Sequence, residues 1–189
     1  MINEPCYGYL FDSTVTSEYE SISLSELICP RIEAEIAFFL GKDLKGPGIT
    51  IPHVLEATAA IAPILEVIDS RFENWKVNVE DAIADNAMAG RVVLSSQLSN
   101  PWNKDLKTMG VVLEKNGKYL DSAAGAAVMG HPALAVAWLA NKLSEYGDYL
   151  KAGEIILPGS FIPAYEIRLN DHFQAHFSQL GSVGITFVE

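Results

Sequence analysis

RIEAEIAFFL, residues 31–40, alternates polar and apolar side chains and then becomes continuously apolar, as a strand does on entering a core. In a strand, residues two apart project to the same side, so Glu33 and Glu35 share one face. Their α-carbons would lie ~6.5–7 Å apart. Ile32 and Ile36 take the opposite face, so we expect one side of this strand to be core and the other to carry carboxylates.

The two carboxylates can converge on one cation, and without a cation between them they would repel one another. Ligation by oxygen alone favours Mg²⁺ or Mn²⁺ over zinc. Glu66 sits in the middle of a second strand-like stretch and is a third candidate ligand. Two alternatives stay open on spacing alone. Glu33 and Glu35 could belong to a solvated strand face, and Glu66 could form a salt bridge with Arg31 or Arg71.

The rest of the chain predicts more strands than helices. Thr50 can cap a helix over residues 50–62 that Pro63 closes, and Asn116-Gly117 supplies the positive φ angles of a tight hairpin turn. Further helices are expected over 78–89 and 132–146, and strands over 64–68, 91–96, 110–114, 118–121, 154–157, 164–169, 172–177 and 183–188. Because strands and helices do not alternate regularly, we predict an α+β fold with a curved, mainly antiparallel or mixed sheet in one domain, residues 1–189.

The bulk composition limits the class of protein. The chain is 49% hydrophobic and 20% charged, with a net charge of −11, and it has no cluster of Lys and Arg for binding nucleic acid. Residues 1–5 show no basic region followed by an apolar stretch, so we expect no signal peptide, and no apolar run is long enough to span a bilayer. Cys6 and Cys29 lie in no paired motif. We therefore expect a soluble cytoplasmic protein with free thiols.

Five stretches carry a family resemblance, and they occur in the family's order over nearly the whole chain. They are PRIEAEIAFFLGKDL (30–44), PILEVIDSRFENW (63–75), IADNA (83–87), GHPALAVAWLA (130–140) and LGSVGITF (180–187). Together they resemble the hydratase/decarboxylase branch of the fumarylacetoacetate hydrolase family. The resemblance implies that family's curved, barrel-like C-terminal fold.

The resemblance also implies a reaction. It indicates a lyase that adds water to 2-hydroxypenta-2,4-dienoate (2-oxopent-4-enoate) to give 4-hydroxy-2-oxopentanoate in aromatic meta-cleavage catabolism. The alternative is decarboxylation of 4-oxalocrotonate, with C–C hydrolysis of an acylpyruvate third. The family's metal ligands fall on Glu33, Glu35 and Glu66, where Mg²⁺ or Mn²⁺ would be chelated by the substrate's carboxylate and 2-oxo groups. Homo-oligomers and a hydratase–decarboxylase complex are implied as partners.

Four further residues are candidates for the site. Asp85 and Asn86 follow an expected helix and can orient substrate or water; the alternative is a capped helix end. Gly159 and Ser160 follow the strand expected over 154–157 and can present backbone N–H groups to a substrate carboxylate; the alternative is a plain turn.

Three features depart from the family pattern. Family members carry an N-terminal segment with a lysine motif before the stretch matching residues 8–11, and we expect that segment to be absent here. Hydratases often have Asp where this chain has Cys6, and the family's Asp-Asn-Ala-Ser ends in Met88. A third hypothesis follows from these differences, namely an inactive or truncated homologue that acts as an assembly subunit.

Overall fold

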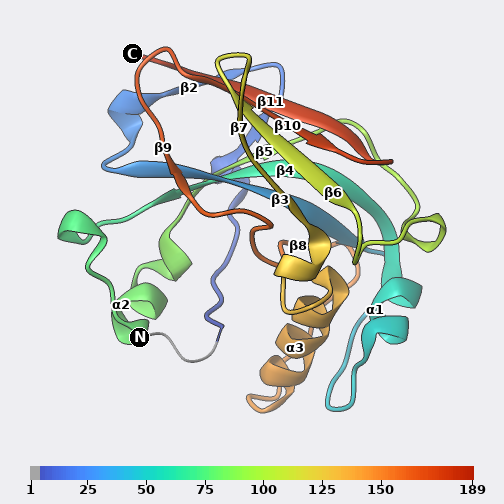
Figure 1. The fold of residues 1–189 in the computed structure, drawn as a ribbon. Helices are drawn as coiled ribbons and strands as arrows, with labels where there is room; N and C mark the ends of the chain where they lie inside the picture. Colours follow the sequence, from blue (N-terminus) through green and yellow to red (C-terminus); the bar gives the residue numbers. More distant parts are fainter. Residues whose placement is uncertain (1–4) are drawn as a thin grey trace.

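Strand β3 (Pro30–Leu40) lies at the centre of the molecule and pairs along its whole length with β4 (Thr58–Asp69). The computed structural model describes residues 5–189 and places these strands in a six-stranded sheet that faces a five-stranded one (Figure 1). The first sheet also contains β1 (Val15–Ser17), β5 (Ala89–Leu94), β8 (Ile155–Ile156) and β9 (Tyr165–Glu166). The second contains β2 (Ser21–Ser23), β6 (Gly110–Lys115), β7 (Lys118–Ala124), β10 (His172–Phe177) and β11 (Gly181–Val188).

Both sheets are mixed. β1 pairs with β5, and β2 with β11, in parallel, whereas the other strand pairs are antiparallel. The helices α1 (Ile51–Ala57), α2 (Val79–Ala84) and α3 (Pro132–Ser144) lie on the side of the first sheet that faces away from the second (Figure 1). The prediction of an α+β fold with few helices is confirmed, and the described strands form two open sheets instead of a closed barrel.

The main core lies between the sheets. Ile32, Ile36 and Phe38 on β3 are fully buried there and belong to the same cluster as Phe173 and Phe187 of the second sheet. The rings of Phe173 and Phe187 meet edge to face at 6.1 Å. Burying a side chain of this size contributes ~1.5–3 kcal/mol. One face of β3 is thus committed to the core, and its other face, with Glu33 and Glu35, looks toward the helices.

The prediction of a helix over residues 50–62 is wrong in its second half. α1 ends at Ala57, and Thr58 already opens β4. The alanine-rich stretch after Thr58 favours a helix locally, but it is paired with β3 on one side and leads into the β5 pairing on the other. Pro63 therefore lies inside a strand, where its carbonyl accepts the Ser95 N–H at 3.3 Å.

The helix expected over 78–89 is also shorter than predicted. Asn78 caps α2 as expected, by accepting the Asp81 N–H at 2.7 Å, but the helix ends at Ala84. The next residues form a left-handed turn, since Asn86 and its two successors have φ angles of 52°, 56° and 61°. β5 then begins at Ala89.

Other local predictions are confirmed. Asn116 and Gly117 have the positive φ angles expected of the hairpin between β6 and β7. α3 begins at Pro132, and His131 caps it by accepting the Ala133 N–H on Nδ1 at 3.1 Å. None of the helices within residues 5–189 combines the length and apolar character needed to cross a membrane.

Candidate metal centre

Three carboxylates meet on the face of the first sheet that looks toward the helices. Glu33 and Glu66 are register partners on β3 and β4, and Glu35 lies two residues further along β3. One carboxylate oxygen from each residue lies within 4.8 Å of those of the other two. Among residues 5–189, this is the one group of three or more acidic, histidine or cysteine side chains gathered closely enough to share an ion.

Burial and mutual repulsion make the charged form of this cluster unfavourable. Burial raises the pKa of Glu33 to about 8, and the charge of Glu66 adds to the effect. The pKa of Glu35, which is 1% exposed, is raised well above its ordinary value by burial and by both neighbouring carboxylates. Burial also raises the pKa of Glu66. Within residues 5–189, no lysine or arginine forms a salt bridge with any of the three, so the cluster lacks a cationic partner.

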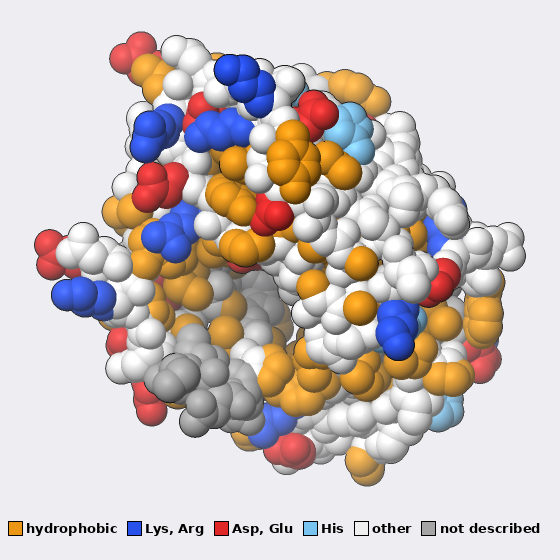
Figure 2. All heavy atoms as spheres, viewed as in Figure 1, with side chains coloured by type: hydrophobic (Ala, Val, Ile, Leu, Met, Phe, Trp, Pro, Cys, Tyr) orange, Lys and Arg blue, Asp and Glu red, His pale blue; other side chains and the backbone are white. Residues whose placement is uncertain are grey.

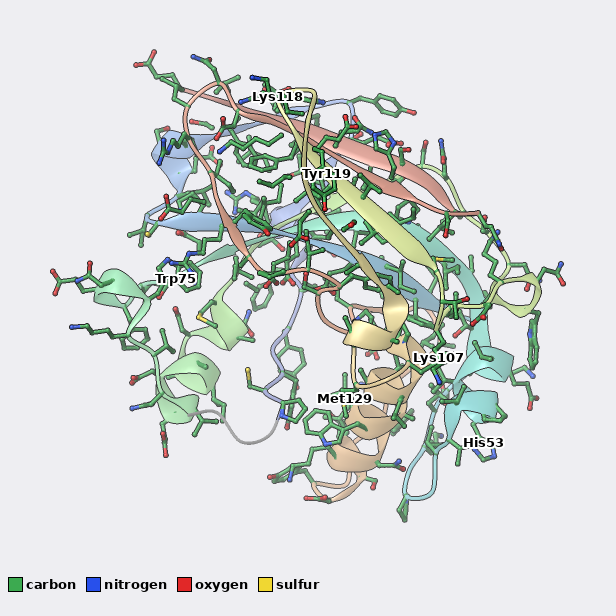
Figure 3. The ribbon with its side chains drawn as sticks, in the orientation of Figure 1. His53, Trp75, Lys107, Lys118, Tyr119 and Met129 are labelled. Carbon is green, nitrogen blue, oxygen red and sulfur yellow. The ribbon has the colours of Figure 1, made fainter. Side chains whose placement is uncertain are left out.

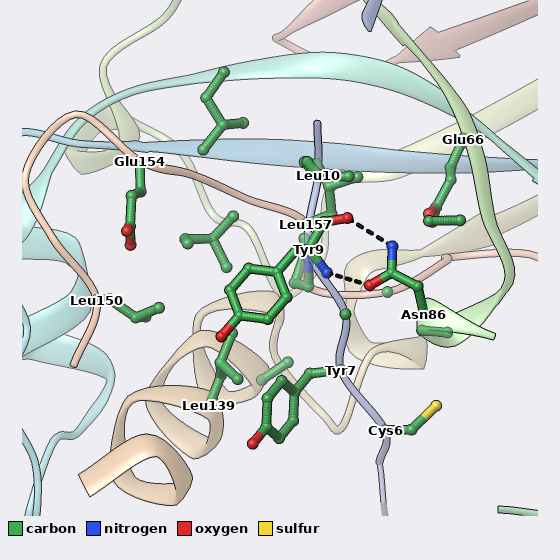
Figure 4. A pocket seen from close by; sticks show the side chains of 18 of the residues that line it. Cys6, Tyr7, Tyr9, Leu10, Glu66, Asn86, Leu139, Leu150, Glu154 and Leu157 are labelled. Atoms are coloured by element: carbon green, nitrogen blue, oxygen red, sulfur yellow. Dashed lines mark hydrogen bonds between the residues drawn. The ribbon is translucent and has the colours of Figure 1, made fainter. Parts of the chain in front are cut away.

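The cluster opens into a cavity of about 680 Å³. Figure 2 shows this face of the molecule hollowed, with hydrophobic side chains around the depression. The cavity is lined by residues 5–12, Val15 at the start of β1, the three glutamates, Ile68, the turn 86–89, Met129, the α3 residues Ala135, Trp138, Leu139 and Leu143, and residues 148–159 except Ala152. Glu66 lies near one end and Glu154 near the other, with Tyr9 and Leu157 between them (Figure 4).

The two candidates after α2 are placed differently. Asn86 lines the cavity, and its amide is bonded to the main chain of Tyr9: Oδ1 accepts the Tyr9 N–H at 2.7 Å, and Nδ2 donates to the Tyr9 carbonyl at 2.8 Å. Asp85 is not among the lining residues. Its carboxylate accepts the Arg71 N–H at 3.2 Å and lies 3.2 Å from the guanidinium of Arg71.

Gly159 and Ser160 also separate. Gly159 lines the cavity, but its N–H donates to Oε2 of Glu35 at 2.9 Å and so fixes a carboxylate of the cluster. Ser160 is not among the lining residues; its hydroxyl donates to the Ala34 carbonyl at 3.4 Å and accepts the Ile162 N–H at 3.3 Å. The structure thus brings Glu33, Glu35, Glu66, Asn86 and Gly159 together, and sets Asp85 and Ser160 apart.

The histidines take no part in the cluster. His53 points outward from α1 toward the edge of the molecule (Figure 3). His172 and His176 hydrogen-bond through Nδ1 to Thr186 and Ser182 on the neighbouring strand, at 2.9 and 2.8 Å. The donor set of the candidate site is therefore purely carboxylate, which suits Mg²⁺, Ca²⁺ or Mn²⁺.

Sequence reasoning did not identify the N-terminal wall of the cavity. Residues 5–11 form no helix or strand, yet Tyr7, Tyr9 and Leu10 line the cavity (Figure 4). The Tyr7 ring lies edge-on to Trp138 of α3, with centroids 6.5 Å apart. Gly8 is the one local signal, since it marks a place where the main chain approaches another segment closely.

Known proteins resemble this chain over almost its whole length. Residues 2–188 match the model of the fumarylacetoacetate (FAA) hydrolase C-terminal family. The chain is 43% identical over 190 residues to a 2-hydroxyhexa-2,4-dienoate hydratase of Comamonas testosteroni, covering 100% of this chain and 72% of the relative. It is 42% identical over 187 residues to a 4-oxalocrotonate decarboxylase of Pseudomonas sp. (strain CF600), covering 99% and 71%.

A solved structure shows the same fold. The 4-oxalocrotonate decarboxylase from Pseudomonas putida G7, complexed with magnesium and adipate, superposes with a TM-score of 0.93 at 39% identity, covering 96% of this chain and 69% of that one. The chain thus spans about 70% of the length of these relatives. By its family match and by the identity and coverage of its relatives, the chain belongs to the fumarylacetoacetate hydrolase family.

Proposed function

We propose that Glu33, Glu35 and Glu66 hold a divalent cation, Mg²⁺ or Mn²⁺, and that the chain is a metal-dependent lyase acting on 2-hydroxydienoates. The convergence of three carboxylates that lack a cationic partner carries this proposal. A cation would offset the burial and the mutual repulsion that together raise the pKa values of Glu33 and Glu35. The magnesium in the related decarboxylase supports the choice of metal.

When bound, a divalent cation supplies Lewis acidity, which stabilises negative charge at the 2-oxygen of a 2-oxo acid. The protein's own residues supply the setting for that chemistry. Glu33 and Glu66 present carboxylates from adjacent strands, and the Gly159 N–H holds the buried Glu35 carboxylate in orientation. The cavity walls take the place of part of the water around a bound acid, which strengthens electrostatic interactions within the cavity.

The far part of the cavity favours a substrate with an uncharged tail. Aromatic and aliphatic side chains line it, among them Tyr7, Leu139 and Leu157. Glu154 and Asp148 line the same region, so a second substrate carboxylate would meet negative charge. This favours hydration of 2-hydroxypenta-2,4-dienoate to 4-hydroxy-2-oxopentanoate, the reaction class named for the hydratase relative.

Decarboxylation of 4-oxalocrotonate is the second candidate, and Lys151 is the observation that favours it. Lys151 is the one cationic side chain among the described lining residues, and it could meet a second carboxylate. The Lys151 ammonium group lies 5.8 Å from the centroid of the Tyr149 ring. The main-chain N–H of Lys151 donates to the Glu154 carboxylate at 2.8 Å. The acidic neighbours of Lys151 weaken its pull on an anion, so we place this reaction second.

The test is a direct comparison of both substrates. We expect ultraviolet loss of 2-hydroxypenta-2,4-dienoate with Mg²⁺ or Mn²⁺, abolished by EDTA, with 4-hydroxy-2-oxopentanoate as product. Release of CO₂ from 4-oxalocrotonate without hydration of the dienoate would reverse the order of the two reactions. Turnover of neither substrate would support the assembly-subunit hypothesis.

Homo-oligomerisation and association with a partner lyase belong to the same proposal. Light scattering after size-exclusion chromatography of the purified protein measures its mass and so tests homo-oligomerisation. Co-elution with a 4-oxalocrotonate decarboxylase tests the hydratase–decarboxylase complex, and separate elution of the two at micromolar concentration would contradict it.

A further inference from the structure

Asn86 makes the same paired contact with the Tyr9 main chain that a neighbouring strand would make. Its side-chain amide offers one acceptor and two donors, and both ends are used on a single residue, at 2.7 and 2.8 Å. The dashed lines in Figure 4 mark the two bonds. Tyr9 and Asn86 are 77 residues apart in sequence, so the amide ties two distant segments together.

The tied segment has little else to hold its main chain. Within residues 5–189, residues 5–10 pair with no strand and make no backbone–backbone hydrogen bond. Leu10 packs against Ala37 and Ile64, beside the carboxylate cluster, while Tyr7 reaches Trp138 on α3. The segment therefore runs along the cavity from the carboxylate cluster toward the far wall. The Asn86 amide holds the main chain of this segment in place at Tyr9.

Two further observations show that this contact is close and specific. A Cβ on Gly8 would lie 2.6 Å from both the carbonyl oxygen and Oδ1 of Asn86, so only glycine fits at this distance. Asn86, Ala87 and Met88 all have positive φ angles, a conformation that costs non-glycine residues ~1–2 kcal/mol each. Strain of this kind persists where the surrounding contacts over-determine it, and here it directs Asn86 into the cavity.

We infer that Asn86 is a positioning residue, which holds residues 7–10 as a wall of the cavity and through that wall orients the tail of the bound acid. Asn86 need not touch the reacting atoms, because both ends of its amide already bind the main chain. The effect on the reaction rests on the proposed function; the effect on the wall does not.

The chain offers a matched control. The Asn141 amide holds Ile49 in the same way: Oδ1 accepts the Ile49 N–H at 2.8 Å, and Nδ2 donates to the Ile49 carbonyl at 2.9 Å. Asn141 is not among the residues that line the cavity. Asn141→Ala therefore removes the same two bonds from a residue that does not itself line the cavity and does not contact residues 5–11 through its amide.

Hydrogen–deuterium exchange tests the wall without any assay of activity. In Asn86→Ala we expect peptides over residues 5–11 to exchange about tenfold faster, because local opening is no longer opposed by the two bonds. In Asn141→Ala the faster exchange should instead appear around Ile49. Unchanged exchange over residues 5–11 in Asn86→Ala would overturn the inference.

Kinetics test the orienting role. We expect kcat/KM for 2-hydroxypenta-2,4-dienoate to fall by about 10²-fold in Asn86→Ala, because a misplaced substrate reacts more slowly. The affinity for Mn²⁺ should stay within about twofold of wild type. Asn141→Ala should keep both values near wild type. An equal loss of kcat/KM in Asn141→Ala would show that Asn86 acts through general stability and would overturn the orienting role.

A second pair of variants perturbs the contact from its other side. Gly8→Ala leaves Asn86 intact but pushes the wall away, so it should reproduce both effects of Asn86→Ala. Gly110→Ala is its control, because a Cβ there would meet no atom nearer than 3.9 Å. If wild type turns over neither substrate while exchange still separates the variants, the proposed function fails and the wall stands.

Discussion

Glu33 of β3 and Glu66 of β4 face one another directly in an antiparallel ladder. Directly opposed side chains in such a ladder have Cβ atoms ~4.5–5.5 Å apart, and like charges there are destabilising. Glu35 brings a third carboxylate to the same face. The fold therefore holds together a set of charges that would be separated if stability alone were at stake, which is why a cation is the expected occupant.

Neutralising one ligand should strongly weaken metal binding without unfolding the protein. We expect Glu33→Gln and Glu66→Gln to weaken Mn²⁺ binding by about 10²-fold or more, measured by calorimetry or by the EPR signal of free Mn²⁺. The metal-free variants should be at least as stable as wild type at pH 8, because a repulsion is removed. The control is Glu154→Gln, because Glu154 is a carboxylate of the same cavity that lies outside the cluster. This variant should bind Mn²⁺ as wild type does. Unchanged affinity in both ligand variants would reject the site.

The metal-free protein should lose stability as pH rises. The ordinary pKa of a glutamate such as Glu33 is 4.5, whereas in the fold it is about 8. Between these values the folded state binds more protons than the unfolded state, so the free energy of unfolding falls with increasing pH. Urea denaturation from pH 5 to 9 should show this decline in wild type and a flatter profile in Glu33→Gln. A profile identical in the two proteins would contradict the raised pKa.

Metal affinity should change in the opposite sense over the same range. A cation binds the ionised carboxylates, so its apparent affinity should rise with pH up to and through the pKa of Glu33, about 8. Calorimetric titration with Mg²⁺ at several pH values measures this rise. The number of protons released on binding should fall as pH increases, because fewer carboxylates are then protonated. Affinity that is constant between pH 5 and 8 would argue against carboxylate ligation.

Substrate preference should follow the charge of the tail. We expect kcat/KM for 2-hydroxypenta-2,4-dienoate to exceed that for 4-oxalocrotonate by about tenfold or more, since a second carboxylate meets acidic side chains in the far wall. Lys151→Met should widen this preference by removing the one cation among the described lining residues. A preference that narrows in Lys151→Met would show that the lysine does not receive the substrate's second carboxylate.

Asp85 can be tested separately from Asn86. Because its carboxylate accepts from the main chain of Arg71 and pairs with the guanidinium, we expect Asp85→Asn to lower the free energy of unfolding by ~1–3 kcal/mol. Denaturant titration measures that loss, and Arg71→Met should show a smaller one. A fall in kcat of more than about 10²-fold at unchanged stability would instead assign Asp85 to the reaction.

The sequence predicted the part of the site that depends on strand periodicity. The spacing of Glu33 and Glu35 places them on one face of β3 wherever that strand lies. The hairpin turn at Asn116-Gly117 was equally readable, because positive φ angles are a property of those residue types. Such features depend on a few neighbouring residues, so a local pattern is enough to find them.

The rest depends on contacts made far along the chain. Thr58–Ala62 looks helical alone, but pairing with β3 makes it a strand. β1 and β2 are three residues each, and they are strands because they pair with the edges of β5 and β11. The N-terminal wall has no periodicity, since Asn86 holds it from 77 residues away.

Because β3 has glutamates on one face and core side chains on the other, a shift in its pairing register with β4 would be energetically costly. A slip of one residue against β4 would exchange the faces, sending Glu33 and Glu35 between the sheets and Ile32 and Ile36 into the cavity. Between the sheets the carboxylates would meet only apolar side chains, with neither the Gly159 N–H nor the cavity beside them, which is costlier than a misplaced isoleucine. The glutamates therefore disfavour the slipped pairing, and a chain that has paired β3 with β4 in the native register has also brought its three carboxylates together.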